Sequence, residues 1–248
     1  MRQNKIELKN VSFAYEKGEN ILNNITFTAA EQESIGLIGV NGAGKSTLLK
    51  MLVGLNLGYE GSICVEEILV EKKTLAKVRE KIGYVFQDSD SQLFMSTAYE
   101  DIAFAPRNYG LTEEEVEKRV AHALAQVHIE YLKERQIYKM SGGEKKLVSI
   151  ATILSMMPDI ILMDEPSIAL DPKNRRNLIR ILNEFSHLKI IASHDLDMIL
   201  DTCERTILLS GGKIVADGKA EEILSNQELL EENGLELPLC MQQRYIGK

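Results

Sequence analysis

The sequence has few of the features that mark secreted or membrane-spanning proteins. It contains three cysteines. Cys64, Cys203 and Cys240 lie far apart and lack metal-ligand spacing, so we expect reduced packing thiols of a cytosolic protein and no disulfide framework. Residues 1–5 show no apolar signal-peptide core. The longest uncharged stretch, residues 147–158, contains serines and a threonine and is too short to span a bilayer. Any link to a membrane should therefore depend on a partner.

An excess of basic charge is also missing. The 29 Lys and Arg residues are outnumbered by 37 Asp and Glu, which gives a net charge of −8 and argues against a surface that coats nucleic acid. We also find no internal repeat, low-complexity linker or heptad array. With 248 residues, of which 44% are apolar, the chain can form one large domain with room for an inserted lobe.

The most informative segment is residues 39–47, Gly-Val-Asn-Gly-Ala-Gly-Lys-Ser-Thr, which separates two apolar runs. The order predicts strand, glycine-rich loop and helix, the context in which G-x-x-x-x-G-K-[ST] binds nucleotide phosphates. Backbone N–H groups and the positive end of the helix dipole would face the anion. An ordinary glycine-rich turn is the weaker alternative. The expected ATP ligands are Gly39, Asn41, Gly42, Ala43, Gly44, Lys45, Ser46 and Thr47.

Roles follow for two of these side chains. Lys45 would reach the β- and γ-phosphates, and the Ser46 hydroxyl would bind Mg²⁺.

The apolar run at 160–163 predicts a buried strand that ends in Asp164 and Glu165, and such strands deliver residues to the edge of the sheet where ligands bind. Asp164 would hold Mg²⁺, and Glu165 would act as general base toward an attacking water. The alternative is an apolar strand ended by a solvated acidic pair.

A second glycine-rich segment begins another predicted helix. Ser141, Gly142 and Gly143 precede a helix expected at residues 144–157. A hydroxyl followed by two glycines at a helix N-terminus presents uncovered backbone N–H groups, which form a nest of phosphate size. Taken alone, a turn with a helix N-cap is the more ordinary interpretation.

These three motifs, in this order, resemble the ABC-type ATPases over most of the chain. The resemblance implies an α/β P-loop NTPase core, with an antiparallel β edge subdomain and an inserted α-helical lobe. It places the core at residues 1–87 and 158–218, the lobe at 88–157, and a helical C-terminal extension at 219–248. Within the lobe, the Thr112-Glu113-Glu114-Glu115 start is typical of a capping box.

The resemblance also assigns single residues. Tyr15 matches the aromatic on which adenine stacks, although a core tyrosine on an edge strand is the alternative. Gln87 matches the glutamine that contacts Mg²⁺ and the attacking water and joins the core to the lobe, an assignment that is wholly positional. His194 matches the histidine that binds the γ-phosphate. The implied catalytic set is Glu165, His194, Gln87 and Lys45, the metal ligands are Ser46, Gln87 and Asp164, and the cofactors are ATP and Mg²⁺.

The family's mechanism implies a second chain. The nest at 141–143 closes over the ATP bound by another subunit, so two ABC ATPase chains meet head-to-tail, with residues 167–171 crossing between them. Whether the two chains are identical or related stays open. Met140, Glu144 and Leu147 depart from the usual Leu, Gln and Arg of the nest motif, which puts the local hydrogen bonding of the lobe in question.

The segments at 88–94 and 97–106 resemble the ATPases of energy-coupling-factor importers, a group that includes cobalt and nickel uptake systems. The chain is accordingly expected to be a peripheral motor subunit at the cytoplasmic face of the membrane. It would power uptake of a vitamin or a transition-metal ion, with integral membrane subunits docked near residues 88–106 and no nucleic-acid partner. The alternatives are a non-transport ABC ATPase or the ATPase of another ABC importer or exporter.

The same segment carries a cluster of acidic residues. We expect Asp88, Asp90, Glu100 and Asp101 to form an acidic groove for basic residues of the membrane partner. A solvated acidic loop is the alternative.

Overall fold

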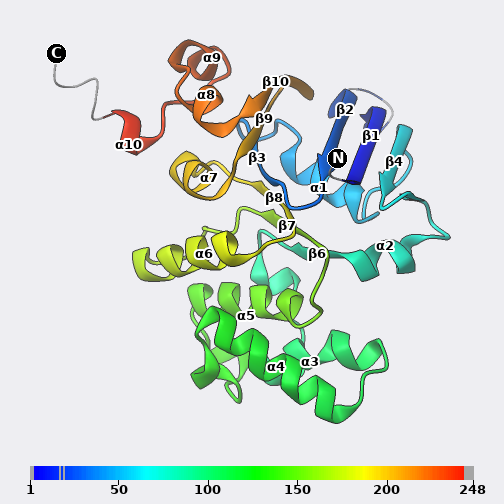
Figure 1. The fold of residues 1–248 in the computed structure, drawn as a ribbon, viewed down its shortest axis with the longest axis vertical. Helices are drawn as coiled ribbons and strands as arrows, with labels where there is room; N and C mark the ends of the chain where they lie inside the picture. Colours follow the sequence, from blue (N-terminus) through cyan, green and yellow to red (C-terminus); the bar gives the residue numbers. More distant parts are fainter. Residues whose placement is uncertain (1–2, 17, 19, 243–248) are drawn as a thin grey trace.

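The computed structural model describes residues 3–16, 18 and 20–242 (Figure 1). The ends of the expected domain ranges, residues 1–2 and 243–248, lie outside the described residues. Two sheets and a group of helices form the molecule, as the predicted α/β core, antiparallel β subdomain and helical lobe require.

The larger sheet has six strands in the order β10-β9-β3-β8-β7-β6. They are β3 (Ser34–Ile38), β6 (Ile82–Val85), β7 (Ile160–Asp164), β8 (Leu188–Ala192), β9 (Arg205–Ser210) and β10 (Lys213–Lys219). All pairs are parallel except β9 with β10, which form the hairpin that the Ser-Gly-Gly-Lys turn at residues 210–213 predicts. Strands β3, β6, β7 and β8 are buried along their whole length, which explains why their sequences are mostly apolar.

The smaller sheet has four antiparallel strands in the order β2-β1-β4-β5. They are β1 (Asn4–Phe13), β2 (Leu22–Ala30), β4 (Glu60–Val65) and β5 (Ile68–Leu69). Strand β2 alternates buried and exposed side chains, because one face packs on the core and the other meets solvent. Its buried face joins the same hydrophobic cluster as strands β3, β7 and β8 of the larger sheet.

Helices pack against the larger sheet, and further helices lie beyond its β6 edge (Figure 1). Those of the core are α1 (Lys45–Leu52), α2 (Leu75–Lys81), α6 (Pro172–Glu184) and α7 (Leu196–Thr202). After β10 follow α8 (Ala220–Leu224), α9 (Gln227–Glu232) and α10 (Leu239–Gln242). Asp171 caps α6 and Pro172 starts it, as the sequence predicts.

The helical lobe consists of α3 (Ala98–Asn108), α4 (Glu113–Val127) and α5 (Gly142–Leu154), which pack on one another at the bottom of Figure 1. Three short 3₁₀ helices accompany them: η1 (Ser89–Ser91), η2 (Glu130–Leu132) and η3 (Ile137–Lys139). Capping boxes start all three long helices, at Thr97, Thr112 and Ser141. The box at Thr112 was predicted. Helix α5 begins at Gly142, two residues before the predicted start.

Candidate functional site

The loop between β3 and α1 has a backbone that requires glycine at two positions. Gly39 has φ 148°, and a Cβ there would lie 2.3 Å from the carbonyl oxygen of Leu209. Gly44 is the N-cap of α1 in the left-handed region, at φ 103°, where a Cβ would lie 2.6 Å from Leu22 Cδ2. Larger residues would push the loop away from β9 and β2, so the glycines fix its path.

The loop encloses a cavity of about 400 Å³. It brings together most of the predicted phosphate ligands with Gln87 and Glu165, which come from the ends of β6 and β7. The lining residues are Ile21, Asn41, Gly42, Gly44, Lys45, Ser46, Thr47, Gln87 and Glu165. The carboxyl edge of the parallel sheet thus collects chemistry from segments more than 100 residues apart.

Lys45 lines this cavity, with its ammonium bound to the backbone of the loop. Its ammonium donates to the carbonyl oxygens of Gly39 at 2.7 Å and Val40 at 3.2 Å. Burial lowers the pKa of Lys45, although the charges of Glu165 and Asp164 act against this shift. Phosphate oxygens would give the ammonium a charged acceptor in place of two neutral carbonyls, a stronger hydrogen bond.

Ser46 and Asp164 are directly bonded. Ser46 Oγ donates to Asp164 Oδ1 at 2.9 Å, and Tyr84 Oη donates to Asp164 Oδ2 at 3.3 Å. Burial and the charge of Asp164 raise the pKa of Tyr84, so the phenol stays a neutral donor. A hydroxyl, a carboxylate and the nearby Gln87 amide are oxygen ligands of the kind that Mg²⁺ prefers, and they fit the predicted metal site by their chemistry.

Glu165 and His194 form a second pair at the same edge. Glu165 is 5% exposed, has φ 48°, and donates its backbone N–H to the Ala192 carbonyl at 2.8 Å. Its Oε2 atom lies 2.7 Å from His194 Nδ1 and accepts from His194 N–H and Ser193 Oγ, both at 3.2 Å. This network orients a carboxylate into the cavity, as a general base requires.

Tyr15 lies beside the loop and not in the core. Its hydroxyl is 3.2 Å from Thr47 Oγ1 and accepts from Asn56 Nδ2 at 3.1 Å. Its ring packs edge-to-face on Phe13, at 5.0 Å between centroids. With more than half of the side chain exposed, a ring fixed in this way leaves a face free for stacking.

The nest at Ser141 does not line the phosphate cavity of its own chain. It lies on α5, where Ser141 N–H donates to Glu144 Oε2 at 2.8 Å and Glu144 N–H donates to Ser141 Oγ at 3.3 Å. Arg135 also donates to Glu144, at 3.3 Å. The unusual Glu144 therefore completes the capping box, and Leu147 is buried in the lobe. The nest contacts the loop at 167–171, since a Cβ at Gly143 would lie 3.1 Å from the Ala169 carbonyl oxygen.

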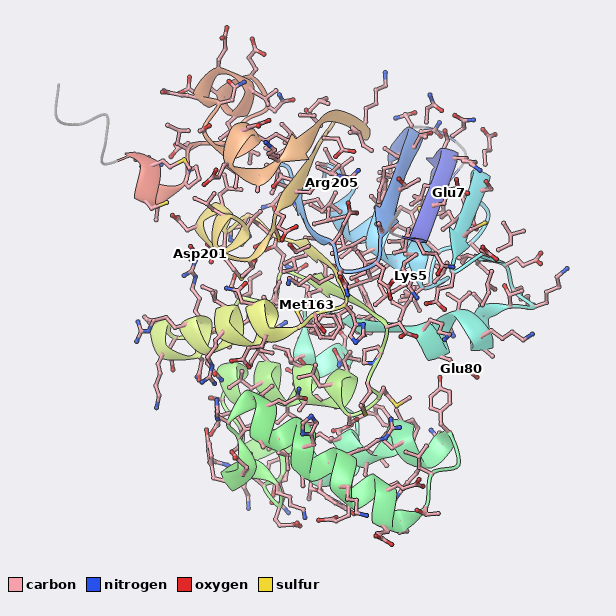
Figure 2. The ribbon with its side chains drawn as sticks, viewed as in Figure 1. Lys5, Glu7, Glu80, Met163, Asp201 and Arg205 are labelled. Atoms are coloured by element: carbon pink, nitrogen blue, oxygen red, sulfur yellow. The ribbon has the colours of Figure 1, made fainter. Side chains whose placement is uncertain are left out.

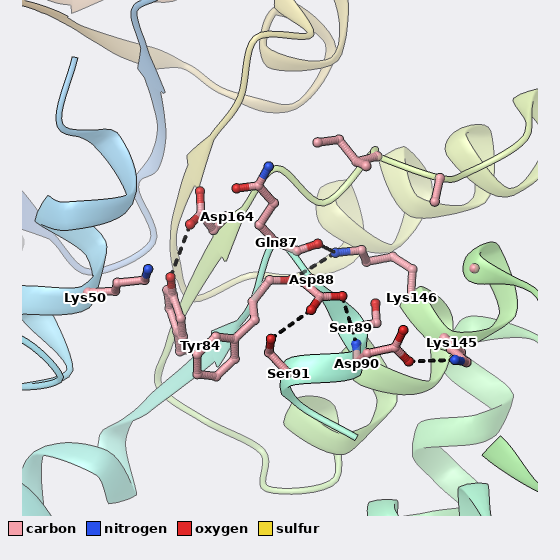
Figure 3. A pocket seen from close by; sticks show the side chains of 14 residues that line it. Lys50, Tyr84, Gln87, Asp88, Ser89, Asp90, Ser91, Lys145, Lys146 and Asp164 are labelled. Carbon is pink, nitrogen blue, oxygen red and sulfur yellow. Dashed lines mark hydrogen bonds and ion pairs between the residues drawn. The ribbon is translucent and has the colours of Figure 1, made fainter. Parts of the chain in front are cut away.

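Sequence reasoning missed Lys146. This side chain is 1% exposed and donates to the carbonyl oxygens of Phe86 at 2.9 Å and Gln87 at 2.7 Å. Figure 3 shows it reaching from α5 toward Gln87, beside a cavity of about 440 Å³ that Asp164 and Gly142 also line. A lysine among the polar residues that start a helix carries no sign that it is buried, so no local signal could have revealed it.

Asp101 does not belong to the predicted acidic groove. Asp101 is 4% exposed and accepts the backbone N–H groups of Phe94 and Met95. The other three carboxylates bind within their own segments or to α5: Glu100 completes the Thr97 capping box, Asp88 caps η1 and Asp90 pairs with Lys145 at 2.6 Å. These contacts order the turn. Asp88 and Asp90 are exposed, so the part of the groove that they would form stays a prediction.

Exposed aromatic side chains lie close to Asp101. Phe94 is 65% exposed and packs edge-to-face on Phe104, at 4.8 Å between centroids. Together with Tyr109 they line a cavity of about 230 Å³ between the lobe and the core residues Arg79 and Tyr84. Figure 2 labels Glu80 on α2, on the side of the core that faces the lobe.

Within the described part of the chain, no helix combines the length and the apolar character that crossing a membrane would require.

Comparison with known proteins places these features in a family. Residues 22–168 match the ABC transporter family. The energy-coupling factor transporter ATP-binding protein EcfA of Carboxydothermus hydrogenoformans is 38% identical over 248 residues, covering 98% of this chain and 92% of that protein. A Geobacter sulfurreducens protein assigned as an ABC transporter ATP-binding protein is 47% identical over 242 residues, or 98% of this chain and 97% of its own.

Solved structures agree with this match. CbiO1 of Clostridium perfringens, described as part of the ABC transporter complex CbiONQ, superposes with a TM-score of 0.82 at 32% identity, over 98% of this chain and 99% of its own. A dimeric ATP-binding cassette in a post-hydrolysis state with ADP and Pi has a TM-score of 0.80 at 29% identity, over 87% and 98% of the two chains. The chain therefore belongs to the ABC transporter family, as one of its ATP-binding and ATP-hydrolysing subunits.

Proposed function

We propose that this chain is the motor subunit of an energy-coupling-factor importer. It works as a head-to-tail dimer at the cytoplasmic face of the membrane and powers uptake of a vitamin or of a transition-metal ion such as cobalt or nickel. The observation that carries the proposal is the likeness to EcfA and CbiO1 over 98% of the chain. The sequence identity to these two proteins, 38% and 32%, is also higher than the 29% identity to the dimeric cassette.

Hydrolysis follows from the residues at the sheet edge. The 39–47 loop and Lys45 bind the phosphates, and Glu165 takes a proton from the attacking water. His194 supports Glu165 through the 2.7 Å contact, and its side chain is 60% exposed. Mg²⁺, held by Ser46, Gln87 and Asp164, would neutralise phosphate charge when bound.

A second chain completes the site. The Ser141 nest lies on α5 and does not line the cavity that Lys45 and Glu165 share, so we assign it to the ATP bound by a second chain. The dimeric form of the related cassette supports pairing of two such chains.

The aromatic surface is the proposed docking place for the membrane subunit. Phe94 and Phe104 expose apolar rings next to the turn that leads to Gln87. Buried at an interface, two rings of this size supply the anchors that binding needs. A movement of the membrane subunit bound at this surface would be transmitted to the proposed hydrolysis site through residues 86–92.

Co-purification tests the proposal. The tagged chain should recover a small integral membrane protein from detergent-solubilised membranes, and Phe94→Ala with Phe104→Ala should lose that protein while keeping ATPase activity in solution. Tyr131→Ala is the matched control, because it removes another exposed ring of the lobe, 69% exposed. Recovery of ribosomal or DNA proteins by the wild-type chain would favour the non-transport alternative.

A further inference from the structure

We propose that Lys146 is a positioning residue for hydrolysis, which fastens Gln87 to helix α5 so that the nest and Gln87 move as one body. The inference rests on the role of Gln87 in the proposed function. It adds a link between two ATP sites that neither the family match nor the relatives' names provide.

Lys146 is a buried lysine whose hydrogen-bond acceptors are backbone carbonyls. Both carbonyl partners belong to the first two residues after β6, Phe86 and Gln87. In the described part of the chain, Lys146 forms no ion pair within 4.0 Å. Burial lowers its pKa, while the more distant charges of Asp164, Asp88 and Glu165 act against this. A buried charge is costly without compensation, and here two backbone carbonyls provide it.

Two further residues of the same segment, Gln92 and Asp90, are bonded to α5. Gln92 accepts the Phe86 N–H at 3.1 Å and donates to Ser149 O at 2.7 Å and Thr152 Oγ1 at 2.8 Å. Lys145 pairs with Asp90. Residues 86–92 are therefore held at both ends against one helix, with Lys146 at the end that carries Gln87 (Figure 3).

Lys146 and the Ser141 nest lie on the same helix. Lys146 follows Ser141 by about 7.5 Å along the axis, at about 1.5 Å per residue. The nest of α5 serves the ATP held by the other chain, whereas Gln87 serves the ATP of its own chain. When α5 shifts to close one site, Lys146 moves the Gln87 backbone in the other, so the two sites of a dimer are coupled through one rigid helix.

A lysine that only fills space would behave differently. It would change stability, and any loss of activity would not depend on the Gln87 side chain. If Lys146 acts through Gln87, the two mutations remove the same contribution and their effects do not add.

The test is a double-mutant cycle on the full-length chain, with steady-state ATPase kinetics. Lys146→Gln, which keeps one donor nitrogen on a shorter and uncharged side chain, should lower kcat about 10- to 100-fold, the range typical for lost second-layer contacts, while KM for ATP changes less than about threefold. Lys146→Arg should restore part of kcat, since its guanidinium can still donate to both carbonyls. In a Gln87→Ala background, Lys146→Gln should cost less than about twofold.

Lys189→Met is the control for loss of a buried lysine. Lys189 is also buried and donates to a carbonyl, Phe185 O, at 3.4 Å, but far from the site. It should lower thermal stability and leave kcat unchanged. The proposal is overturned if Lys146→Gln lowers kcat equally with and without the Gln87 side chain, or if it leaves kcat unchanged. Full activity of Gln87→Ala alone would instead show that the proposed role of Gln87 fails.

Discussion

Replacement of Arg175 by methionine should destabilise the fold next to the hydrolysis site. Arg175 on α6 donates Nε and Nη2 to the two carboxylate oxygens of Asp195, both at 2.7 Å. Asp195 caps α7 by accepting the Met198 N–H at 3.0 Å, and it follows His194 directly. The pair therefore ties α6 to the turn that presents His194 to Glu165.

The expected loss in the free energy of unfolding follows from the burial of the Arg175–Asp195 pair. The side chains are 29% and 20% exposed. Breaking a buried pair costs about 3–5 kcal/mol and breaking an exposed one about 0–1 kcal/mol. We expect about 2–3 kcal/mol for this pair, since solvent screens it in part. At about 2–4 °C per kcal/mol for a chain of this size, Tm should fall by about 4–12 °C.

Thermal and urea unfolding, followed by circular dichroism, measure this loss. Lys118→Met is the control, because Lys118 pairs with Glu114 on α4 at 2.6 Å with both side chains mostly exposed, and it should cost less than about 0.5 kcal/mol. Equal losses in the two variants would refute the reasoning from burial.

The effect should also depend on pH. Burial raises the pKa of Asp195, but the hydrogen bonds from Arg175 and Met198 N–H outweigh it and hold the pKa below its ordinary value. A carboxylate with a lowered pKa contributes stability that is present above its unfolded pKa of about 3.9 and is lost as the pH falls further. The difference between wild type and Arg175→Met should therefore shrink below about pH 4, and a constant difference would contradict this cause.

Three more predictions concern the nucleotide. Gly39→Ala should abolish binding of a fluorescent ATP analogue, because its Cβ would lie 2.3 Å from the Leu209 carbonyl oxygen; retained affinity would show that the loop can shift. Tyr15→Ala should weaken ATP binding by the stacking contribution of about 1–3 kcal/mol, whereas Tyr15→Phe should keep most of the affinity, and equal losses would argue against stacking. Ser46→Ala and removal of divalent ions by chelator should each suppress hydrolysis, measured by phosphate release, more than nucleotide binding; unchanged turnover in both would exclude the proposed metal site.

The sequence predicts the elements whose cause is local. The phosphate loop, the Thr112 capping box, the Asp171-Pro172 helix start and the β9–β10 hairpin all depend on neighbouring residues. Helix α3 could not be predicted in this way, because Pro106 lies inside it. The Ile102 carbonyl that Pro106 leaves free accepts the Ser155 hydroxyl at 2.9 Å, from a helix about 50 residues later in the chain.

The same limit applies to the candidate site. The residues of the cavity follow recognisable motifs, so their positions could be read from the chain. Lys146 and Asp101 could not, because their environment is made by distant backbone: the carbonyls of Phe86 and Gln87 for one, and the buried turn at residues 94–95 for the other. A charged residue next to other polar residues reads as exposed, and only the fold shows otherwise.

The central claim is that ATP is enclosed between the phosphate loop of one chain and the Ser141 nest of another. Its most direct test is the mass of Glu165→Gln, by light scattering after gel filtration with saturating ATP and Mg²⁺. The variant should bind ATP without hydrolysing it and elute at twice the chain mass of 27.9 kDa, and addition of Ser141→Arg should return it to the single chain. A Glu165→Gln chain that stays monomeric with ATP bound, or that hydrolyses ATP at the wild-type rate, would contradict the account.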